Sequence, residues 1–416
     1  VKGREYERSD DPRFLREKEV VEQHGGRVIY SSGDIVFSSS TLIDNLPVDD
    51  DLEAQRLGAI CRRHGVTHDS LRQVLDRFAG LRVLIVGDIV LDRYVYCDML
   101  EVTSEAPMLS LSKLDEQSYV GGAAIVARHV AALGAQAFLL SAAANDEESS
   151  RVEAALGAEN VQTHLLRCRP NLVEKTRFLV EETKMIRYET GQRIPLDSIA
   201  QRKANLILDH EGDVADAVIF CDFGYGMITD ELLQRTLGRL RSTGRTIAAD
   251  VSGPHANLLN FRDIDLLCPT ERELRANLHD YDRGLSSTAW TVLEKTQSRH
   301  LIVTLGKNGL VAFDRPTHDR EHPDWSARLL SEHLPSFADR SVDRLGCGDA
   351  LLAAATLTLA TGASLMHAAY LGNAAAALEI AKLGNLPIDG APLRRWISGR
   401  SELAAPAGTP SLVSAV

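Results

Sequence analysis

The sequence lacks the excess of positive charge that a polyanion-binding protein needs. Its 46 Lys and Arg residues stand against 58 Asp and Glu residues, which gives a formal net charge of −12 over 416 residues. A net acidic chain argues against binding to the nucleic acid backbone or to an anionic membrane surface. A small anionic substrate, held by a few local cations, is compatible with this charge.

Long apolar runs and paired cysteines are also missing. The most apolar stretch, 351–381, is interrupted at 361–364 and carries His367 and Asn373, so each half is too short to cross a bilayer of about 30 Å. The charged start, Val1 to Arg8, does not resemble a signal peptide. The absence of a Cys-x-x-Cys pair excludes a local zinc site and a disulfide framework. The cysteines are Cys61, Cys97, Cys168, Cys221, Cys268 and Cys347. We therefore expect a soluble, cytoplasmic protein without a membrane or nucleic acid partner.

The alternation of short apolar runs with helical segments is typical of an α/β protein. Short apolar runs that end in Gly, Asp or Cys predict buried parallel strands, and helical segments such as 125–133 and 231–241 separate them. The strands are expected at 83–88, 217–222, 246–250, 264–268 and 301–306. This alternation predicts a doubly wound, mostly parallel sheet. The segments 95–120 and 165–188 alternate with a period of two and predict a small β-lid over the carboxyl edge of that sheet.

The chain divides into four expected parts. Residues 1–46 form a short α/β appendage with a helix at 13–23, a strand at 27–30 and a Ser-rich turn at 38–41. Residues 47–80 form a linker and a helix over 52–79. The main domain covers 81–400, with lid strands at about 93–120 and 165–190, and a C-terminal tail covers 401–416.

The strongest local signal is the octapeptide Asp343 to Ala350, followed by a helix of small residues over 351–360. Glycines before a helix leave main-chain N–H groups and the positive end of the helix dipole open to an anion. Asp349, in the first turn, could accept the proton of a hydroxyl that attacks a phosphoryl group. The alternative is that Asp349 simply caps the helix after a Gly turn.

Two further glycine motifs have a functional and a purely structural interpretation. The segment 302–310 is a strand that enters a turn at Gly306 and Gly309, where the backbone could approach a nucleotide and Thr304 could bind a phosphate. It could equally be a hairpin turn without a ligand. Gly121 and Gly122, which open a helix, could let a sugar lie against the main chain or could serve close helix–sheet packing.

In this order and at these distances, the three motifs resemble the ribokinase or pfkB family of ATP-dependent sugar kinases, over about 81–386. Within the family, the chain is most similar to heptose-7-phosphate kinases of the ADP-heptose pathway. Four segments besides the octapeptide carry this likeness: 86–94, Ser104 to Pro107, 121–124, and 373–376 together with 382–384. The resemblance implies a ribokinase-like fold, ATP and Mg²⁺, a sugar or sugar-phosphate substrate, and a homodimer formed through the β-lid.

The resemblance also assigns roles to residues. Asp349 would be the catalytic base, and Gly346, Cys347 and Gly348 would provide the anion hole. Around ATP it implies Thr304, Gly306, Gly309 and Asn373, and Glu273 would hold Mg²⁺ through water. Around the sugar it implies Asp88, Asp92, Gly121 and Gly122. Lys175, Arg177 and Arg187, in the lid strands, could hold a substrate phosphate, or could be solvated cations that protect a sheet edge.

Several positions depart from the family pattern and concern mainly the sugar side. An Asn that grips sugar hydroxyls is replaced by Ile125, and two threonines of the anion-hole motif by Arg344 and Leu345. The Asn-x-x-Glu motif that organises magnesium water has Thr270 in place of Asn, and Tyr225 stands where the family has a lysine after the central strand. These changes predict phosphoryl transfer with an altered substrate, or a catalytically weakened protein that binds a nucleotide or sugar.

The N-terminal segment has a resemblance of its own. Val1 to Tyr6, Gly25-Gly26 and Phe37 to Ile43 look like the last third of a cytidylyltransferase-like nucleotidyltransferase domain. The His-x-Gly-His motif of that family is absent from the 416 residues. We therefore expect either missing upstream sequence, which would make this chain the kinase half of a bifunctional enzyme, or a structural remnant in which 38–41 is a turn and helix cap.

Overall fold

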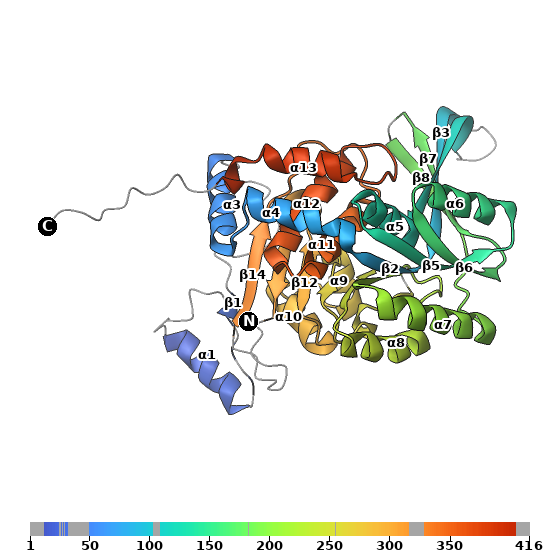
Figure 1. Ribbon diagram of the computed structural model, residues 1–416. Coiled ribbons are helices and arrows are strands. Elements are labelled where there is room, and N and C mark those ends of the chain that lie inside the picture. The colour runs from blue at the N-terminus through green and yellow to red at the C-terminus, as the bar shows by residue number, and fades with distance from the viewer. Residues whose placement is uncertain are drawn as a thin grey trace.

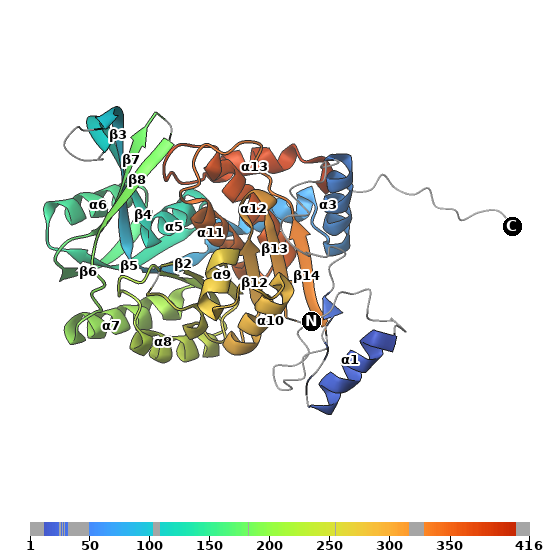
Figure 2. The same cartoon turned by 180° about the vertical axis from the view of Figure 1, so that it is seen from behind.

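A ten-stranded, mostly parallel sheet forms the centre of the protein (Figures 1 and 2). The computed structural model describes residues 12–24, 26, 28, 30–31, 50–102, 109–181, 183–253, 255–315 and 328–404. In spatial order the strands are β1 (Tyr30–Ser31), β14 (Arg328–Leu334), β13 (Leu310–Asp314), β12 (His300–Thr304), β11 (Leu266–Leu267), β10 (Thr246–Val251), β9 (Ala217–Asp222), β2 (Arg82–Gly87), β5 (Gln136–Ala144) and β6 (Val161–Arg169). The strand β13 runs antiparallel to both of its neighbours, β12 and β14.

Helices cover both faces of this sheet and define two hydrophobic cores. One face packs against α3 (Asp50–His64), α4 (His68–Arg77), α5 (Ala123–Ala132), α6 (Glu147–Ala158), α11 (Cys347–Ala360), α12 (Leu365–Ile380) and α13 (Gly390–Ser398). The other packs against α7 (Ser198–Val214), α8 (Asp230–Ser242), α9 (Glu271–Leu278) and α10 (Leu285–Thr296). Along β2, Val83 and Ile85 enter the first core and Leu84 and Val86 the second, because side chains alternate across a strand. This confirms the expected doubly wound α/β fold.

The lid is a separate four-stranded sheet. Its order is β4 (Leu109–Gly122), β3 (Ile89–Val102), β7 (Val173–Val180) and β8 (Thr183–Thr190), and β3 and β7 pair in parallel. In both ribbon views β3, β7 and β8 rise beyond the end of the large sheet (Figures 1 and 2). The expected lid segment 165–190 starts inside β6, which pairs with β5 in the large sheet, so the small sheet takes up this part of the chain only from Val173.

The segment before the main domain differs from expectation in its second helix. The single helix expected over 52–79 is two helices, because Gly65 has a φ of +67° and Thr67 begins α4 with a capping box to Ser70. The helix α1 (Pro12–Gln23) matches the helix expected at 13–23, and β1 adds an edge strand to β14. Expectations for 1–6, 38–41, 104–107 and 405–416 lie outside the described residues.

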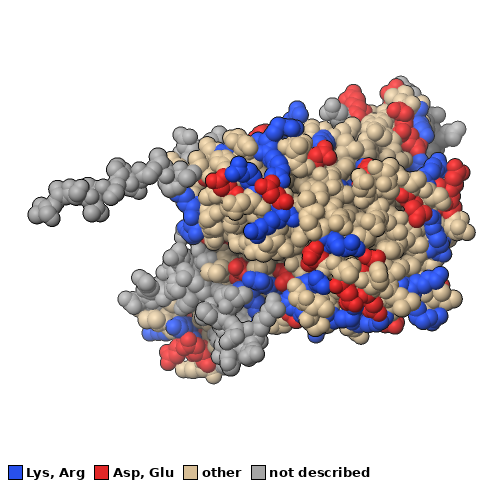
Figure 3. Space-filling model, viewed as in Figure 1, with Lys and Arg blue, Asp and Glu red and all other residues tan. Residues whose placement is uncertain are grey.

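Two surface features bear on partners. On the face seen in Figure 3, acidic and basic side chains lie side by side between wide uncharged areas. The strand β8 exposes Met185, Ile186 and Tyr188, with exposed fractions of 40%, 45% and 59%, so a dimer through the lid stays a prediction. In the described part of the chain, no helix has the length and apolar character needed to cross a bilayer.

The fold places a ligand site beside the carboxyl end of β2. From β2 the chain passes through the lid strands β3 and β4 to β5 on one side, whereas β9 and β10 lie on the other side. Strand order therefore reverses at β2, and in open α/β sheets ligands bind outside the carboxyl ends of the strands at such a point. Asp88 follows β2 and Asp222 ends β9, so both acids lie at this edge.

A substitution at Gly122 tests how closely lid strand β4 packs against the main domain. Its φ is +65°, and a Cβ on it would lie 2.3 Å from the carbonyl oxygen of Asp88. We expect Gly122→Ala to lower the free energy of unfolding by more than ~1 kcal/mol, because strain and overlap add. The control is Gly238→Ala on the exposed face of α8, where a Cβ meets nothing within 4 Å. That change should stabilise by about 0.5–1 kcal/mol. Denaturant unfolding measures both, and equal stability of Gly122→Ala and the unmodified protein would contradict this account.

Candidate active site

A cleft of about 780 Å³ opens beside α11, and most of the residues expected around a nucleotide line it. Its walls come from the ends of β10 and β12, the start of α9, the loop before α11, and α12. The expected site residues in this cleft are Glu273, Thr304, Gly306, Gly309, Cys347, Gly348, Asp349 and Asn373. Segments up to a hundred residues apart in sequence therefore meet at one place, as the motifs predicted.

The N-terminus of α11 forms one end of this cleft. Gly346 occupies the N-cap position with a φ of +86°, and in the described structure no side chain caps the helix. A Cβ on Gly346 would lie 2.1 Å from Oδ1 of Asn385, so a larger residue does not fit there. An uncapped helix N-terminus presents main-chain N–H groups and positive potential to an anion. This geometry is the one expected of the anion hole.

Asp349 lies in the first turn of the same helix. Burial raises the pKa of its carboxyl group to about 7, and the negative charges of Asp92 and Glu273 act in the same direction, whereas Lys175 opposes them. Asp349 therefore lies within electrostatic range of Asp92 and Lys175 on the lid strands. It is also within range of Glu273 on α9. A carboxyl group with a pKa near 7 can exchange a proton with a substrate at neutral pH.

The loop between β12 and β13 lines the opposite wall. Thr304 ends β12, and Gly309 begins the return into β13 with a φ of +81°. A Cβ on Gly309 would lie 2.1 Å from the carbonyl oxygen of Leu334, so this turn requires glycine for structural reasons. Asn373, on α12, donates from Nδ2 to the carbonyl oxygen of Pro335 at 2.7 Å. The structural interpretation of this turn therefore holds, and the turn also lines the cleft.

Four carboxyl groups lie at or beside the carboxyl ends of β9 and β10. They belong to Asp222, Asp250, Glu273 and Asp349. Burial raises the pKa of Asp250 well above its usual range, and Glu273, Asp349 and Asp222 add to this rise through their negative charges. Burial also raises the pKa of Asp222 to about 7. The sequence analysis gave Asp250 no role, although its place at the end of a buried strand next to β9 could have indicated one.

These acids suit a metal ion that binds through water. Among the described residues, no group of three or more His, Cys, Asp or Glu side chains is arranged to hold a metal directly. Oε2 of Glu273 accepts hydrogen bonds from the main-chain N–H and the hydroxyl of Thr270, both at 2.9 Å. Thr270, which stands where the family has Asn, is thus the N-cap of α9. Its capping box with Glu273 holds that side chain at the cleft. Hard oxygen donors that leave room for water and phosphate oxygens fit Mg²⁺.

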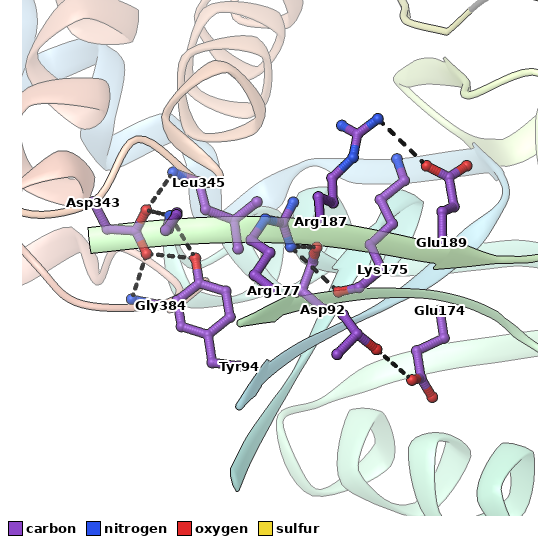
Figure 4. Close-up of polar contacts among 12 residues, drawn as sticks. Asp92, Tyr94, Glu174, Lys175, Arg177, Arg187, Glu189, Asp343, Leu345 and Gly384 are labelled. Atoms are coloured by element: carbon purple, nitrogen blue, oxygen red, sulfur yellow. Dashed lines mark hydrogen bonds and ion pairs between the residues drawn. The ribbon is translucent and has the colours of Figure 1, made fainter. Parts of the chain in front are cut away.

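Where the sugar is expected, two buried acids are already paired with arginines. Oδ1 of Asp88 lies 3.1 Å from Nη2 of Arg169, a residue that the sequence analysis did not single out. Burial nevertheless raises the pKa of Asp88 to about 6. Asp92 forms an ion pair with Arg177 (Figure 4). A Cβ on Gly121 would lie 2.3 Å from Oδ2 of Asp92. The glycine therefore leaves room for the Asp92 carboxylate next to β4.

The three lid cations have different surroundings. Arg177 is neutralised by Asp92, and the side chain of Arg187 is 63% exposed and lies 3.6 Å from Glu189. Lys175 is partly buried, with its Nζ 5.8 Å and 5.5 Å from the ring centres of Phe223 and Tyr225. Within the described ranges no hydrogen bond or ion pair reaches its ammonium group, and burial lowers its pKa.

Three of the departures from the family pattern now have a structural context. Ile125 is fully buried in the core. The hydroxyl of Tyr225 donates a hydrogen bond to Glu189 of the lid. Leu345 packs against the lid cluster of Tyr94, Tyr119 and Leu179.

The raised pKa of Asp349 has a consequence for stability. Its folded-state pKa of about 7 exceeds the unfolded value of about 3.9, so ionisation penalises the fold as pH rises from 4 to 7. Asp349→Asn removes this penalty and should stabilise the protein at pH 8 by on the order of 4 kcal/mol, with little difference at pH 4. Asp339→Asn, at the exposed rim of the same cleft, is the control and should show no such pH dependence. Unfolding titrations at both pH values test this, and an equal effect at pH 4 and pH 8 would contradict it.

Comparison with known proteins identifies the family of the chain. The sequence profile described as "pfkB family carbohydrate kinase" matches residues 81–387. The chain is 28% identical over 344 residues to the bifunctional protein HldE of Bradyrhizobium diazoefficiens, covering 81% of this chain and 66% of that protein. It is 26% identical over 321 residues to the bifunctional protein HldE of Pelobacter propionicus, covering 76% and 63%. The match thus spans about two thirds of the length of these relatives.

Solved structures show the same fold. Phosphofructokinase-2 from Escherichia coli in complex with potassium superposes with a TM-score of 0.61 at 19% identity, covering 76% of this chain and 99% of that one. Ribokinase from Arabidopsis thaliana, complexed with ribose and ATP, superposes with a TM-score of 0.59 at 18% identity, covering 76% and 98%. The family profile covers well over half of the sequence, and the family inferred from the motifs is confirmed: this chain belongs to the pfkB family of carbohydrate kinases.

Proposed function

We propose that the protein is an ATP-dependent kinase that transfers the γ-phosphoryl group to a hydroxyl of a sugar phosphate. The observation that carries this proposal is the position of Asp349, with its raised pKa, at the uncapped N-terminus of α11 in a cleft large enough for a nucleotide. A base and an anion site within one helical turn are what phosphoryl transfer to an alcohol requires.

In this mechanism Asp349 accepts the proton of the attacking hydroxyl. A pKa of about 7 leaves a substantial fraction of its carboxylate ready to do so at neutral pH, while keeping it basic enough to take the proton. The N–H groups at Gly346, Cys347 and Gly348 face the negative charge that develops on the transferring group. Because these donors belong to a helix packed in the core, they need little reorganisation during the reaction.

The remaining residues of the cleft would hold the nucleotide. Thr304, Gly306 and Gly309 offer a hydroxyl and close backbone approach along one wall, and Asn373 lies on the other. Asp250 and Glu273 would hold Mg²⁺ through its water ligands. The ion would supply positive charge that offsets the charge on the triphosphate.

For the acceptor we propose a phosphorylated sugar of the heptose-7-phosphate type. Lys175 supports this choice, because its partly buried ammonium group makes no direct ion pair within the described ranges and can therefore bind a substrate phosphate. The relatives named bifunctional protein HldE support it as well, and their name favours the kinase half of a bifunctional enzyme. A nucleotidyltransferase-like origin of residues 1–46 remains a proposal on the same grounds.

The base assignment predicts a specific loss of turnover. Asp349→Asn should lower kcat by about 10²–10⁴-fold, because general-base assistance is lost, while ATP affinity stays nearly unchanged. ADP release coupled to an indicator, with heptose-7-phosphate, fructose phosphates and ribose as acceptors, measures turnover, and calorimetry measures ATP binding. Asp339→Asn serves as the control. Undiminished sugar phosphorylation by Asp349→Asn would refute the mechanism, and ATP binding by the unmodified protein without turnover on any sugar would favour a binding protein.

The role of Lys175 predicts a difference between acceptors. Lys175→Met should raise KM for a sugar phosphate by about tenfold or more, since a buried charge pair is lost. KM for an unphosphorylated sugar should change little. Lys113→Met, on lid strand β4 with a side chain that is 57% exposed, is the matched lid control and should leave both values nearly unchanged. Equal changes in KM for both acceptors would show that Lys175 does not bind the acceptor phosphate.

A further inference from the structure

A buried carboxylate outside the nucleotide cleft joins the lid to the loop that leads into α11. Asp343 is almost completely buried, and its side chain is 1% exposed. Four donors reach its two oxygens: the hydroxyl of Tyr94 at 2.6 Å, Nζ of Lys184 at 2.6 Å, and the main-chain N–H groups of Leu345 at 3.1 Å and Gly384 at 3.2 Å (Figure 4). Such a set satisfies a buried carboxylate.

These donors come from two parts of the protein, the lid sheet and the loops beside α11. Tyr94 lies on β3 and Lys184 on β8, so both belong to the lid sheet. Leu345 lies in the loop that ends at Gly346, the N-cap of α11, and Gly384 lies in the loop after α12. The carboxylate of Asp343 therefore ties two lid strands to the two loops that surround the N-terminus of α11.

Apolar contacts reinforce the same junction. The side chain of Leu345 packs on the lid cluster of Tyr94, Tyr119 and Leu179. A Cβ on Gly384 would lie 2.2 Å from the ring of Tyr119, so the loop after α12 also lies directly against the lid. The leucine in this loop, which departs from the family pattern, thus has a structural partner in the lid.

The junction lies immediately before the proposed anion hole. Asp343 precedes Gly346 by three residues, and the bond from the N–H of Leu345 fixes the backbone between them. Oδ1 of Asn385, next to Gly384, lies 2.1 Å from the position of a Cβ on Gly346. A shift of either loop would therefore move the N-terminus of α11, and displacements of about 1 Å at such a site can cost a hundredfold in rate.

We propose that Lys184 and Tyr94 are positioning residues that act through Asp343 to hold the N-terminus of α11 in the geometry for phosphoryl transfer. The lid then has a second role besides covering the acceptor, since its packing against the loop sets the anion hole. This inference rests on the proposed kinase function, because it assigns the N–H groups of α11 to the transferring group.

Lys184 is the residue to test, since its side chain is 40% exposed and its removal need not unfold the protein. The variants are Lys184→Met, which removes the ammonium group, and Lys184→Arg, which keeps the charge. The control is Lys113→Met, a lid lysine on β4 that is 57% exposed and pairs with Glu116 of its own strand. Steady-state kinetics are measured on each variant of the whole chain. Hydrogen exchange of the same variants is detected by mass spectrometry.

Lys184→Met should lower kcat by about tenfold or more, through displacement of the anion hole, with KM for ATP nearly unchanged. Peptides containing Leu345 and Gly384 should exchange faster, because both N–H groups bond to Asp343. Lys184→Arg should restore most of kcat and of the protection, and Lys113→Met should change neither.

Unchanged exchange and unchanged kcat in Lys184→Met would overturn the inference, and so would faster exchange without a loss of kcat. A loss in Lys113→Met as large as in Lys184→Met would do the same, because the effect would then be one of the lid in general. Failure of the proposed function has a different signature: Asp349→Asn would then be as active as the unmodified protein, whatever Lys184→Met does.

Discussion

The uncapped N-terminus of α11 is the feature on which the rest of the site depends. Its N–H groups attract negative charge, and the carboxyl group of Asp349, one turn inside, resists ionisation because it is buried near other acids. The free N–H groups of such a helix end need hydrogen-bond partners, which an anion can supply. The glycine at 346, the close approach of Asn385 and the absence of a capping side chain in the described structure all keep this end open.

Charge balance explains why the lid belongs to the site. The acids at the switch point of the sheet would destabilise one another without cations nearby. Arg169, at the end of β6, and Arg177, on lid strand β7, neutralise Asp88 and Asp92, and Lys184 neutralises Asp343. The lid strands are inserted directly after β2 and after β6, so the chain delivers these cations to the edge where the acids gather.

The sequence predicted the fold well and marked residues that line one cleft, because local patterns encode both. Buried strands appear as apolar runs, and Gly306, Gly309 and Gly346 mark turns whose backbone excludes a side chain. The ion pairs between distant segments could not be predicted, since nothing local shows that Lys184 meets Asp343 159 residues later. The same holds for the break at Gly65, where a single glycine outweighs a continuous helical pattern.

The central claim is that the N–H groups at the start of α11 bind the terminal phosphate beside Asp349. A crystal structure of the protein with a non-hydrolysable ATP analogue and a sugar phosphate tests it most directly. The account predicts the γ-phosphate within hydrogen-bonding distance, about 3 Å, of the N–H groups of residues 346–349, with the acceptor hydroxyl next to the Asp349 carboxylate. A triphosphate bound elsewhere, with these N–H groups bonded to other atoms of the protein, would contradict it.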